Sequence, residues 1–402
     1  MNLNQVAKFV LNIGALLLIL LPFQSCQRVK ETEEPMRRIY LCTDQEIGWW
    51  EQKVPCQITG TLGHDTLHYQ GVVNYRGGTS SKFYKHSYTL KLSQADTLCG
   101  LPKNKSWILN ASYIDKTFMR HKLCYDLFRM MGEYNVAPQC QYALVYENNN
   151  PKGLYVVMQR LNKKVLDIDK HDSTACIFKE PRIFYVEMPV VETTDGNYHG
   201  QTFPEFAVKD ASGLVMQFRD FILTASDDDF FRKISDWVDI RNVIDWHLLL
   251  LFTNNGDGVL KNFYLYKKNA QTPFRIALWD CDHSFGRDGD NELNMLQVTI
   301  DDDRNIMLNR LWKLPWYREA MAKRWTQLRD KGVVSYKTIA NMVMYNERFI
   351  RPGLAENAGL WPANSKDYFD DNEFDEEVKI LLKFAKLSLE AMDKRFQRNV
   401  RK

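Results

Sequence analysis

The sequence predicts an α+β protein with two lobes, a β-rich N-terminal lobe and an α-rich C-terminal lobe. Segments that alternate apolar and polar residues fill the chain from Ile39 to about residue 165, whereas helical spacing prevails after it. The 402 residues carry 53 Lys and Arg against 50 Asp and Glu, and 45% are hydrophobic. This near balance of charge argues against a protein that coats nucleic acid, and the apolar fraction is typical of a globular core.

Residues 1–25 read as a lipoprotein-type signal peptide. Lys8 precedes an apolar run from Phe9 to Phe23, which is too short for a typical membrane span. The run is followed by Ser25 and Cys26, and a small residue before a cysteine resembles the lipidation site of bacterial lipoproteins. We therefore expect residues 26–38 to form a tether and Cys26 to carry a lipid that anchors an exported protein to the bacterial outer membrane or cell surface. Plain secretion is the alternative.

Strands dominate the predicted first lobe, residues 39–165. Alternation predicts strands at Gln57–Leu62, Thr66–Tyr69, Gly71–Tyr75, Ser87–Leu92 and Trp107–Leu109. Apolar residues at helical spacing predict a helix over Asp115–Met131, which Gly132 ends. Two further strands, Tyr142–Tyr146 and Leu154–Met158, are expected to pair across the turn at 148–153. This lobe therefore reads as a sheet plus one helix.

Helices dominate the predicted second lobe, residues 166–402. The polar segment Gly196–Ser212 reads as a long loop. Apolar spacing predicts helices at Gly213–Ala225, Asp227–Trp237, Asp239–Phe252, Asn305–Arg329 with a break at Pro315, Ser335–Phe349 and Phe374–Arg398. A pair of strands, Asn262–Tyr266 and Phe274–Trp279, is set among them. A site is expected at the junction of the two lobes.

The eight cysteines show no CxxC motif and no Cys/His cluster at zinc spacing. This argues against structural zinc. Buried thiols and disulfides remain alternatives for the cysteines other than Cys26.

The segment Thr253–Asn262 carries the most informative polar residues. Asp257 and Asn262 have the D-x-x-x-x-N spacing of a kinase catalytic loop, in which the Asp orients or deprotonates the acceptor hydroxyl and the Asn holds magnesium. A strand, a turn and a second strand follow, and then Asp280 and Asp282 stand where a kinase places its metal-binding carboxylate. The alternative is an ordinary turn at Asn255–Gly258 and two acids that cap a helix.

A Gly- and Ser-rich turn, Asn74–Lys82, lies between two predicted strands. Such a turn can lay backbone N–H groups along phosphates, and Arg76 and Lys82 are available to an anionic group. Lys91, on the following strand, is a candidate to contact the α and β phosphates. Read alone, the pattern favours a hairpin bend for the turn and a solvated strand residue for Lys91.

In chain order, these blocks resemble the spore-coat CotH kinase family. The matching segments are Arg76–Ser81, Lys85–Lys91, Ala111–Asp115 with Arg120, Gly153–Tyr155, Asn255–Asp257 with Asn262 and Tyr264, and Trp279–Asp282 with Phe285–Gly286. The resemblance implies a divergent, two-lobed protein-kinase-like fold that transfers the γ-phosphate of ATP to Ser or Thr, with Mg²⁺ or Mn²⁺. It also implies a protein substrate with a Ser/Thr-rich segment.

The resemblance assigns roles to residues of this chain. Asp257 is implied as the catalytic carboxylate, and Asn262, Asp280 and Asp282 as metal ligands. The ATP-binding residues that it implies are Arg76, Gly77, Ser80, Ser81, Lys91 and the position of Gln159. Gln159 stands where the family pattern has Glu, and an amide cannot supply that negative charge.

Two other functions fit parts of the sequence. A non-catalytic surface binding or adhesion protein with a kinase-like fold would explain Gln159 and the lack of an evident ATP supply outside the cytoplasm. A phosphatase of the haloacid-dehalogenase type would use Asp280 as nucleophile and Asp282 as acid and base. That motif requires the first strand of a parallel sheet, which the pattern around Asp280 does not favour.

Overall fold

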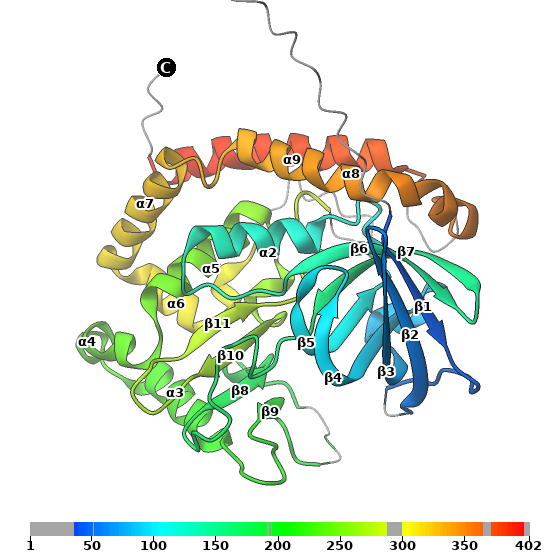
Figure 1. The fold of residues 1–402 in the computed structure, drawn as a ribbon. Coiled ribbons are helices and arrows are strands. Elements are labelled where there is room, and N and C mark those ends of the chain that lie inside the picture. The colour runs from blue at the N-terminus through cyan, green and yellow to red at the C-terminus, as the bar shows by residue number, and fades with distance from the viewer. Residues whose placement is uncertain are drawn as a thin grey trace, which may run out of the picture. The chain divides into compact units, whose positions relative to one another are not determined.

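Seven strands of the N-terminal half close into a barrel in the order β1-β2-β3-β4-β5-β7-β6 (Figure 1). Their bounds are β1 Arg38–Cys42, β2 Val54–Leu62, β3 Asp65–Arg76, β4 Ser87–Leu98, β5 Leu101–Asn110, β6 Cys140–Glu147 and β7 Asn150–Gln159. Strand β1 closes the barrel because it pairs antiparallel with β2 and parallel with β6. The sequence predicted strands here but not their closure, and it divided β3 wrongly into two strands.

The description comes from a computed structural model and covers residues 36–50, 52–190, 193, 195–287, 300–364 and 371–397. Residues 36–402 belong to one compact unit. The predicted signal peptide and Cys26 lie outside the described residues. The predicted lobe boundary at residue 165 stays a prediction.

Alternation along each strand separates the inside of the barrel from its outside. Val73, Leu90 and Trp107 are fully buried in the barrel core, whereas Lys91, next to Leu90, is exposed. Successive side chains of a strand point to opposite faces. The outer face of β3, β4 and β5 can therefore carry polar groups without disturbing the core.

The hairpin of β6 and β7 is confirmed, but its turn is shorter than the predicted turn at 148–153, because residues 150–153 already belong to β7. Asn148 and Asn149 have φ values of +47° and +65°, and Glu147 pairs with Asn150 across them. Two central residues with positive φ are typical of the tight turns that match strand twist, and Asn tolerates this conformation.

A second sheet of four strands has the order β11-β10-β8-β9. Its strands are β8 Cys176–Lys179, β9 Gln201–Phe203, β10 Phe263–Lys267 and β11 Arg275–Leu278. Strand β9 lies within the segment that was predicted as a loop, and β8 was not predicted. All three strand pairs of this sheet are antiparallel. The phosphatase hypothesis for Asp280 is therefore wrong, because its motif needs a parallel sheet.

The described helices are α2 Arg120–Met131, α3 Ser212–Thr224, α4 Asp227–Trp237, α5 Ile240–Thr253, α6 Ile306–Lys313, α7 Pro315–Asp330, α8 Tyr336–Leu360 and α9 Phe374–Arg395, with short 3₁₀ turns at Thr79–Lys82, Arg182–Phe184, Asp257–Val259 and Asp302–Arg304. The predicted break at Pro315 is confirmed, since Pro315 is the first residue of α7. Helix α8 runs 11 residues beyond its predicted end at Phe349. Figure 1 shows α8 and α9 along one edge, and α8 also contacts β6 and β7.

Helix α2 begins at Arg120 rather than at Asp115, the predicted start. The carboxylate of Asp115 accepts hydrogen bonds from the backbone N–H groups of Thr117 (3.1 Å) and Arg120 (2.9 Å). It therefore satisfies the N–H group of Arg120, the first residue of the helix, and that of Thr117 in the turn before it. As a result, Arg120 and His121 occupy the first turn of α2.

The seven cysteines in the described part of the chain are free. The disulfide alternative therefore does not hold for them. Among the described helices, none has the length and apolar character that crossing a membrane requires.

Candidate active site

A cavity of about 560 Å³ opens between the outer face of the barrel and the four-stranded sheet. Two rows of cross-strand neighbours line its barrel side, Val72, Lys91 and Ser106 in one row and Asn74, Thr89 and Ile108 in the other. Tyr264 of β10 and Trp279, just after β11, line the opposite side. The cavity thus lies between strands of the N-terminal half of the chain and strands of the four-stranded sheet.

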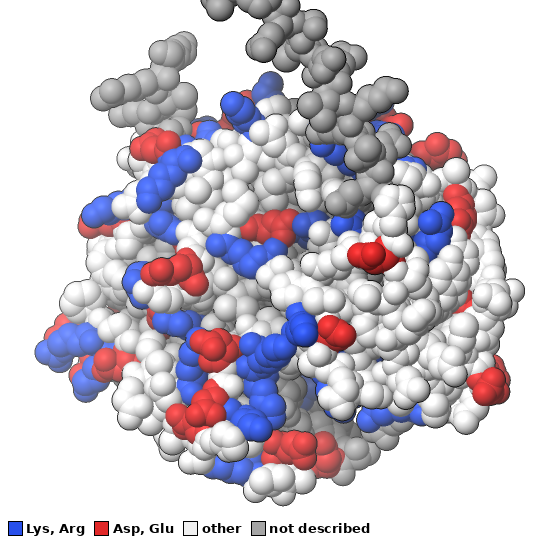
Figure 2. Space-filling view, in the orientation of Figure 1, with Lys and Arg blue, Asp and Glu red and all other residues white. Residues whose placement is uncertain are grey.

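Five cationic side chains line this cavity, namely Lys53, Arg76, Lys91, Arg160 and Lys179. Among the described residues that line it, none is Asp or Glu. Figure 2 shows Lys and Arg side chains, with acidic ones among them, over the part of this face where β8–β10 lie in Figure 1. Such a concentration of positive charge in a concave site suits a polyanion such as a chain of phosphates.

The Gly- and Ser-rich turn contributes Arg76, Gly77 and Gly78 to the cavity, but not Ser80 or Ser81. Gly77 has a φ of +151°, and a Cβ there would lie 2.6 Å from Ser80 Oγ. Only glycine fits this position without displacing the turn. Ser80 and Ser81 belong to the short 3₁₀ turn, where the hydroxyl of Ser81 donates to the carbonyl of Gly78 (2.7 Å).

Gln159 lies outside the cavity, although its neighbour Arg160 lines it. Its side chain is 5% exposed, its Oε1 accepts from the N–H of Gln139 (3.3 Å), and its Nε2 donates to the carbonyl of Pro102 (3.4 Å). A neutral amide can both donate and accept in this way. In the structure, Gln159 of β7 therefore links β5 to the residue that precedes β6. Its position does not support the expectation that it contacts the nucleotide.

Asp280 and Asp282 lie beside a histidine that the sequence did not single out. His121 Nε2 lies 2.8 Å from Asp280 Oδ1. Ligand atoms of His121, Asp280 and Asp282 lie within 4.8 Å of one another. The Asp280 side chain is 41% exposed, so this group is open on one side. Two carboxylates and an imidazole at this spacing fit a divalent cation.

The surroundings shift the pKa values of the two aspartates in opposite directions. Burial opposes ionisation of Asp280, but its hydrogen bond to His121 and the charges of His121 and Arg76 hold its pKa well below the usual range. Burial and the nearby charge of Asp280 raise the pKa of Asp282. Burial would lower the pKa of His121, but the hydrogen bond to Asp280 and the charge of Asp282 raise it to about 9. The carboxylates thus favour a positive charge beside them, which His121 carries without a metal ion and which a bound divalent cation would supply in its place.

The predicted catalytic loop, Thr253–Asn262, runs beside the loop that carries the two aspartates. We call residues 279–287 the metal loop, after the metal ligands that were predicted in it. The N–H of Trp279 donates to the carbonyl of Asn262 (3.2 Å), and the N–H of Phe285 donates to the carbonyl of Thr253 (2.8 Å). Backbone hydrogen bonds therefore tie the metal loop to both ends of the catalytic loop.

Asp257 forms an ion pair with Lys261 (2.9 Å). Lys261 lines a second cavity of about 420 Å³, and Lys179 lines both cavities. Asn262 has a φ of +63° and is 7% exposed, and it directly precedes β10. The predicted residues Arg76, Gly77 and Lys91 thus share one cavity, while Asp257 lies next to the second one.

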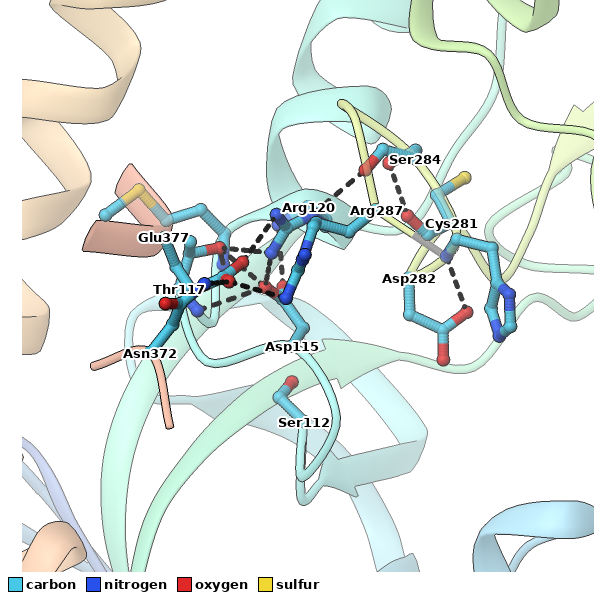
Figure 3. Close-up of polar contacts among 12 residues, drawn as sticks. Ser112, Asp115, Thr117, Arg120, Cys281, Asp282, Ser284, Arg287, Asn372 and Glu377 are labelled. Atoms are coloured by element: carbon cyan, nitrogen blue, oxygen red, sulfur yellow. Dashed lines mark hydrogen bonds and ion pairs between the residues drawn. The ribbon is translucent and has the colours of Figure 1, made fainter. Parts of the chain in front are cut away.

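A buried network of charges supports the metal loop from behind (Figure 3). Arg120 contacts Asp115, Glu377 and the carbonyl of Ser284 in the metal loop. Arg287 also contacts Glu377 (3.0 Å). Asp115 and Arg120 belong to one of the sequence blocks noted above, and the structure shows that this block holds the metal loop.

Sequence reasoning missed His121, Lys53, Arg160, Lys179 and Glu377. His121 follows Arg120 directly, and its place in the first turn of a helix was the one available signal. Arg160 and Lys179 stand at or just after strand ends, and no local pattern distinguishes them from solvated lysines and arginines. Glu377 lies among acids at the start of α9, where acidic residues are common for helix stability alone.

Comparison with known proteins agrees with the order of the sequence blocks. The model of the family described as CotH kinase protein matches residues 73–392. The inner spore coat protein H of Bacillus subtilis (strain 168) is 25% identical over 326 residues, which cover 78% of this chain and 84% of that protein. Because the family model matches well over half of the chain, the protein belongs to the CotH kinase family.

Proposed function

We propose that this protein is a CotH-like atypical protein kinase that transfers the γ-phosphate of ATP to Ser or Thr of an exported or surface protein. The observation that carries the proposal is the cation-lined cavity next to the cluster of His121, Asp280 and Asp282. The proposal includes a two-lobed, kinase-like fold, in which the barrel forms one lobe and the helical part the other.

The cavity residues would bind the phosphates and orient them. Arg76, Lys91 and Lys179 can each donate to phosphate oxygens, and Arg76 and Lys179 lie close enough to Asp280 for their charges to act on it. Asp280, Asp282 and Asn262 would hold Mg²⁺ or Mn²⁺. When bound, the metal ion would neutralise charge on the β and γ phosphate oxygens.

Asp257 is proposed to receive the acceptor hydroxyl through the second cavity. In the transfer, the hydroxyl oxygen forms a bond to the γ-phosphorus, its proton passes to the Asp257 carboxylate, and the bond between the γ-phosphorus and the ADP oxygen breaks. Lys261 holds the Asp257 carboxylate in place at 2.9 Å. The acceptor would be a Ser/Thr-rich protein segment, the substrate that the family resemblance implies, and it would approach along the polar residues that line the second cavity.

The location of the protein is a further part of the proposal. Its relative is named an inner spore coat protein, which supports association with an envelope or coat. Together with the sequence of residues 1–26, this supports an exported protein that is lipid-anchored through Cys26. Mass analysis of the native N-terminus tests this part, and an unmodified terminus downstream of Cys26 would contradict it.

The enzyme hypothesis is tested with ATP and either Mg²⁺ or Mn²⁺. The full chain is expected to bind ATP only with a divalent cation and to incorporate phosphate into Ser or Thr of a Ser-rich test protein. Asp280→Ala is expected to lower transfer by at least about 100-fold, because metal-assisted charge stabilisation provides a large part of such a rate. Asp257→Ala is expected to lower transfer and to leave ATP affinity within about twofold.

A wild-type protein that binds no nucleotide and incorporates no phosphate would contradict this proposal. The non-catalytic binding protein would then be the better hypothesis. Gln159 in place of the family Glu is the feature of this chain that motivated that alternative.

A further inference from the structure

We infer that Glu377, on the C-terminal helix α9, is a positioning residue of the metal site and acts through Arg120. The inference rests on the proposed metal-dependent function. Figure 3 shows Glu377 and Asp115 on one side of Arg120 and Ser284 of the metal loop on the other.

Three close contacts fix the guanidinium of Arg120, which also donates a longer hydrogen bond to the Thr117 hydroxyl (3.4 Å). Its Nε donates to the carbonyl of Ser284 (3.0 Å), one terminal nitrogen contacts Asp115 Oδ1 (2.5 Å), and the other contacts Glu377 Oε2 (3.1 Å). A guanidinium is planar, so its three N–H directions are rigidly linked. The two carboxylates therefore decide where the Nε–H points, and that N–H holds the metal loop.

The first turn of α2 contacts the metal loop at two places. His121 binds the side chain of Asp280, and Arg120 binds the backbone of Ser284, four residues later. The hydroxyl of Ser284 also donates to the carbonyl of Cys281, the residue between the two aspartates (2.7 Å). A shift of Arg120 would consequently reach both aspartates.

Glu377 holds two cations of this network together. Its Oε2 accepts from Arg120, and its Oε1 accepts from Arg287 of the metal loop (3.0 Å) and from Asn372 (3.0 Å). Its side chain is 3% exposed. A neutral amide in place of Glu377 would remove the negative charge that Arg120 and Arg287 share. Arg120 contacts the metal loop, and Arg287 belongs to it.

A purely stabilising role is a poor explanation of such a network. Buried ion pairs cost much of their attraction in lost hydration, and apolar residues of similar volume often stabilise a protein as well or better. The charged groups instead fix the orientation of the Arg120 guanidinium and, through it, the position of the metal loop. We therefore assign Glu377 to the geometry of the aspartates rather than to the stability of α9.

The test compares Mn²⁺ affinity of full-length variants, measured by electron paramagnetic resonance of the free ion. Glu377→Gln keeps the shape and removes the charge, and we expect it to weaken Mn²⁺ binding by about 10- to 100-fold, as loss of a supporting group around a metal site does. Glu376→Gln is the matched control. Glu376 is the preceding residue of α9, its side chain is 52% exposed, and it pairs with Lys379 (3.1 Å), so its replacement should leave Mn²⁺ affinity unchanged.

Wild-type affinity in Glu377→Gln would overturn the inference, even if its melting temperature fell. Should that variant fail to fold, Arg120→Lys carries the test. Lysine keeps the charge but cannot contact Ser284, Asp115 and Glu377 in one plane, so the same loss of Mn²⁺ affinity is expected, and unchanged affinity would overturn the inference. A wild type that binds no Mn²⁺ would overturn the proposed function as well, which separates the two failures.

Discussion

The barrel interior and the interior beneath the metal loop are both buried, yet different groups fill them. Val73, Leu90 and Trp107 represent the barrel core, which the structure fills with apolar side chains. Beneath the metal loop, Arg120, Asp115 and Glu377 are as deeply buried as those apolar residues. Apolar burial has no preferred direction, whereas hydrogen-bonded charges do. The barrel thus supplies stability, and the charged interior supplies orientation.

The largest expected effect on stability lies in the barrel. Trp107→Ala removes a fully buried indole and should lower the free energy of unfolding by about 3–5 kcal/mol, because it loses apolar burial and leaves a cavity. Urea unfolding measures this loss. Mn²⁺ affinity of the folded fraction should stay unchanged, and a clear drop in that affinity would break the proposed division between stability and orientation.

A smaller loss is expected for a buried charge of the helical part that lies away from the metal loop. Asp393 accepts from Trp325 Nε1 (2.8 Å) and from Arg329 Nε (3.0 Å). Asp393→Ala should lower the free energy of unfolding by about 1.5–3 kcal/mol, the usual worth of hydrogen bonds to a charged group. Asp393→Asn keeps one acceptor and should recover part of the loss in the same urea experiment. No recovery would indicate that the charge, rather than the hydrogen bond, carries the effect.

The smallest expected effect is a pH dependence of the helical part. Burial lowers the pKa of His247 despite its hydrogen bond to Asp302, so the folded state binds this proton more weakly than the unfolded state. Stability should then be full above the unfolded value of about 6.5 and fall as the pH drops below it, by at most about 1.4 kcal/mol per pH unit. Unfolding between pH 7 and pH 5 measures this slope.

His247→Gln should flatten that slope. The slope need not vanish, because burial also lowers the pKa values of His86 and His199. An unchanged slope would show that His247 does not contribute. Burial raises the pKa of Asp302, but the hydrogen bond to His247 and the charge of His247 outweigh burial and lower it. The contribution of Asp302 to stability is therefore lost only at more acidic pH.

Much of the local structure was predictable because its causes are local. The hairpin at Asn148 and Asn149, helices α3 to α5 and the break at Pro315 follow from turn chemistry and apolar spacing within a few residues. The backbone contacts between the catalytic loop and the metal loop follow from the strand pair β10–β11, which the sequence also predicted. The family resemblance placed Asp257, Asn262 and Asp280 in these two loops.

Other features depend on residues that are far apart in the chain. Closure of the barrel requires β1 to pair with β6, about a hundred residues away along the chain, and no pattern in either strand specifies a partner. The cationic cavity gathers Lys53, Arg160 and Lys179 from separate strands and loops. Each of these residues alone looks like any exposed lysine or arginine.

By itself, the sequence determined most of the strands and helices, though not β8, β9 or several element ends, and the loops that carry the aspartates. It did so because backbone preferences and apolar periodicity act over short distances. Tertiary structure decided which side chains surround those loops. His121 reaches Asp280, and Glu377 reaches Arg120, only because α2 and α9 pack against the metal loop. The physical reason is that a charge acts on its neighbours in space, and the chain order does not record which residues these will be.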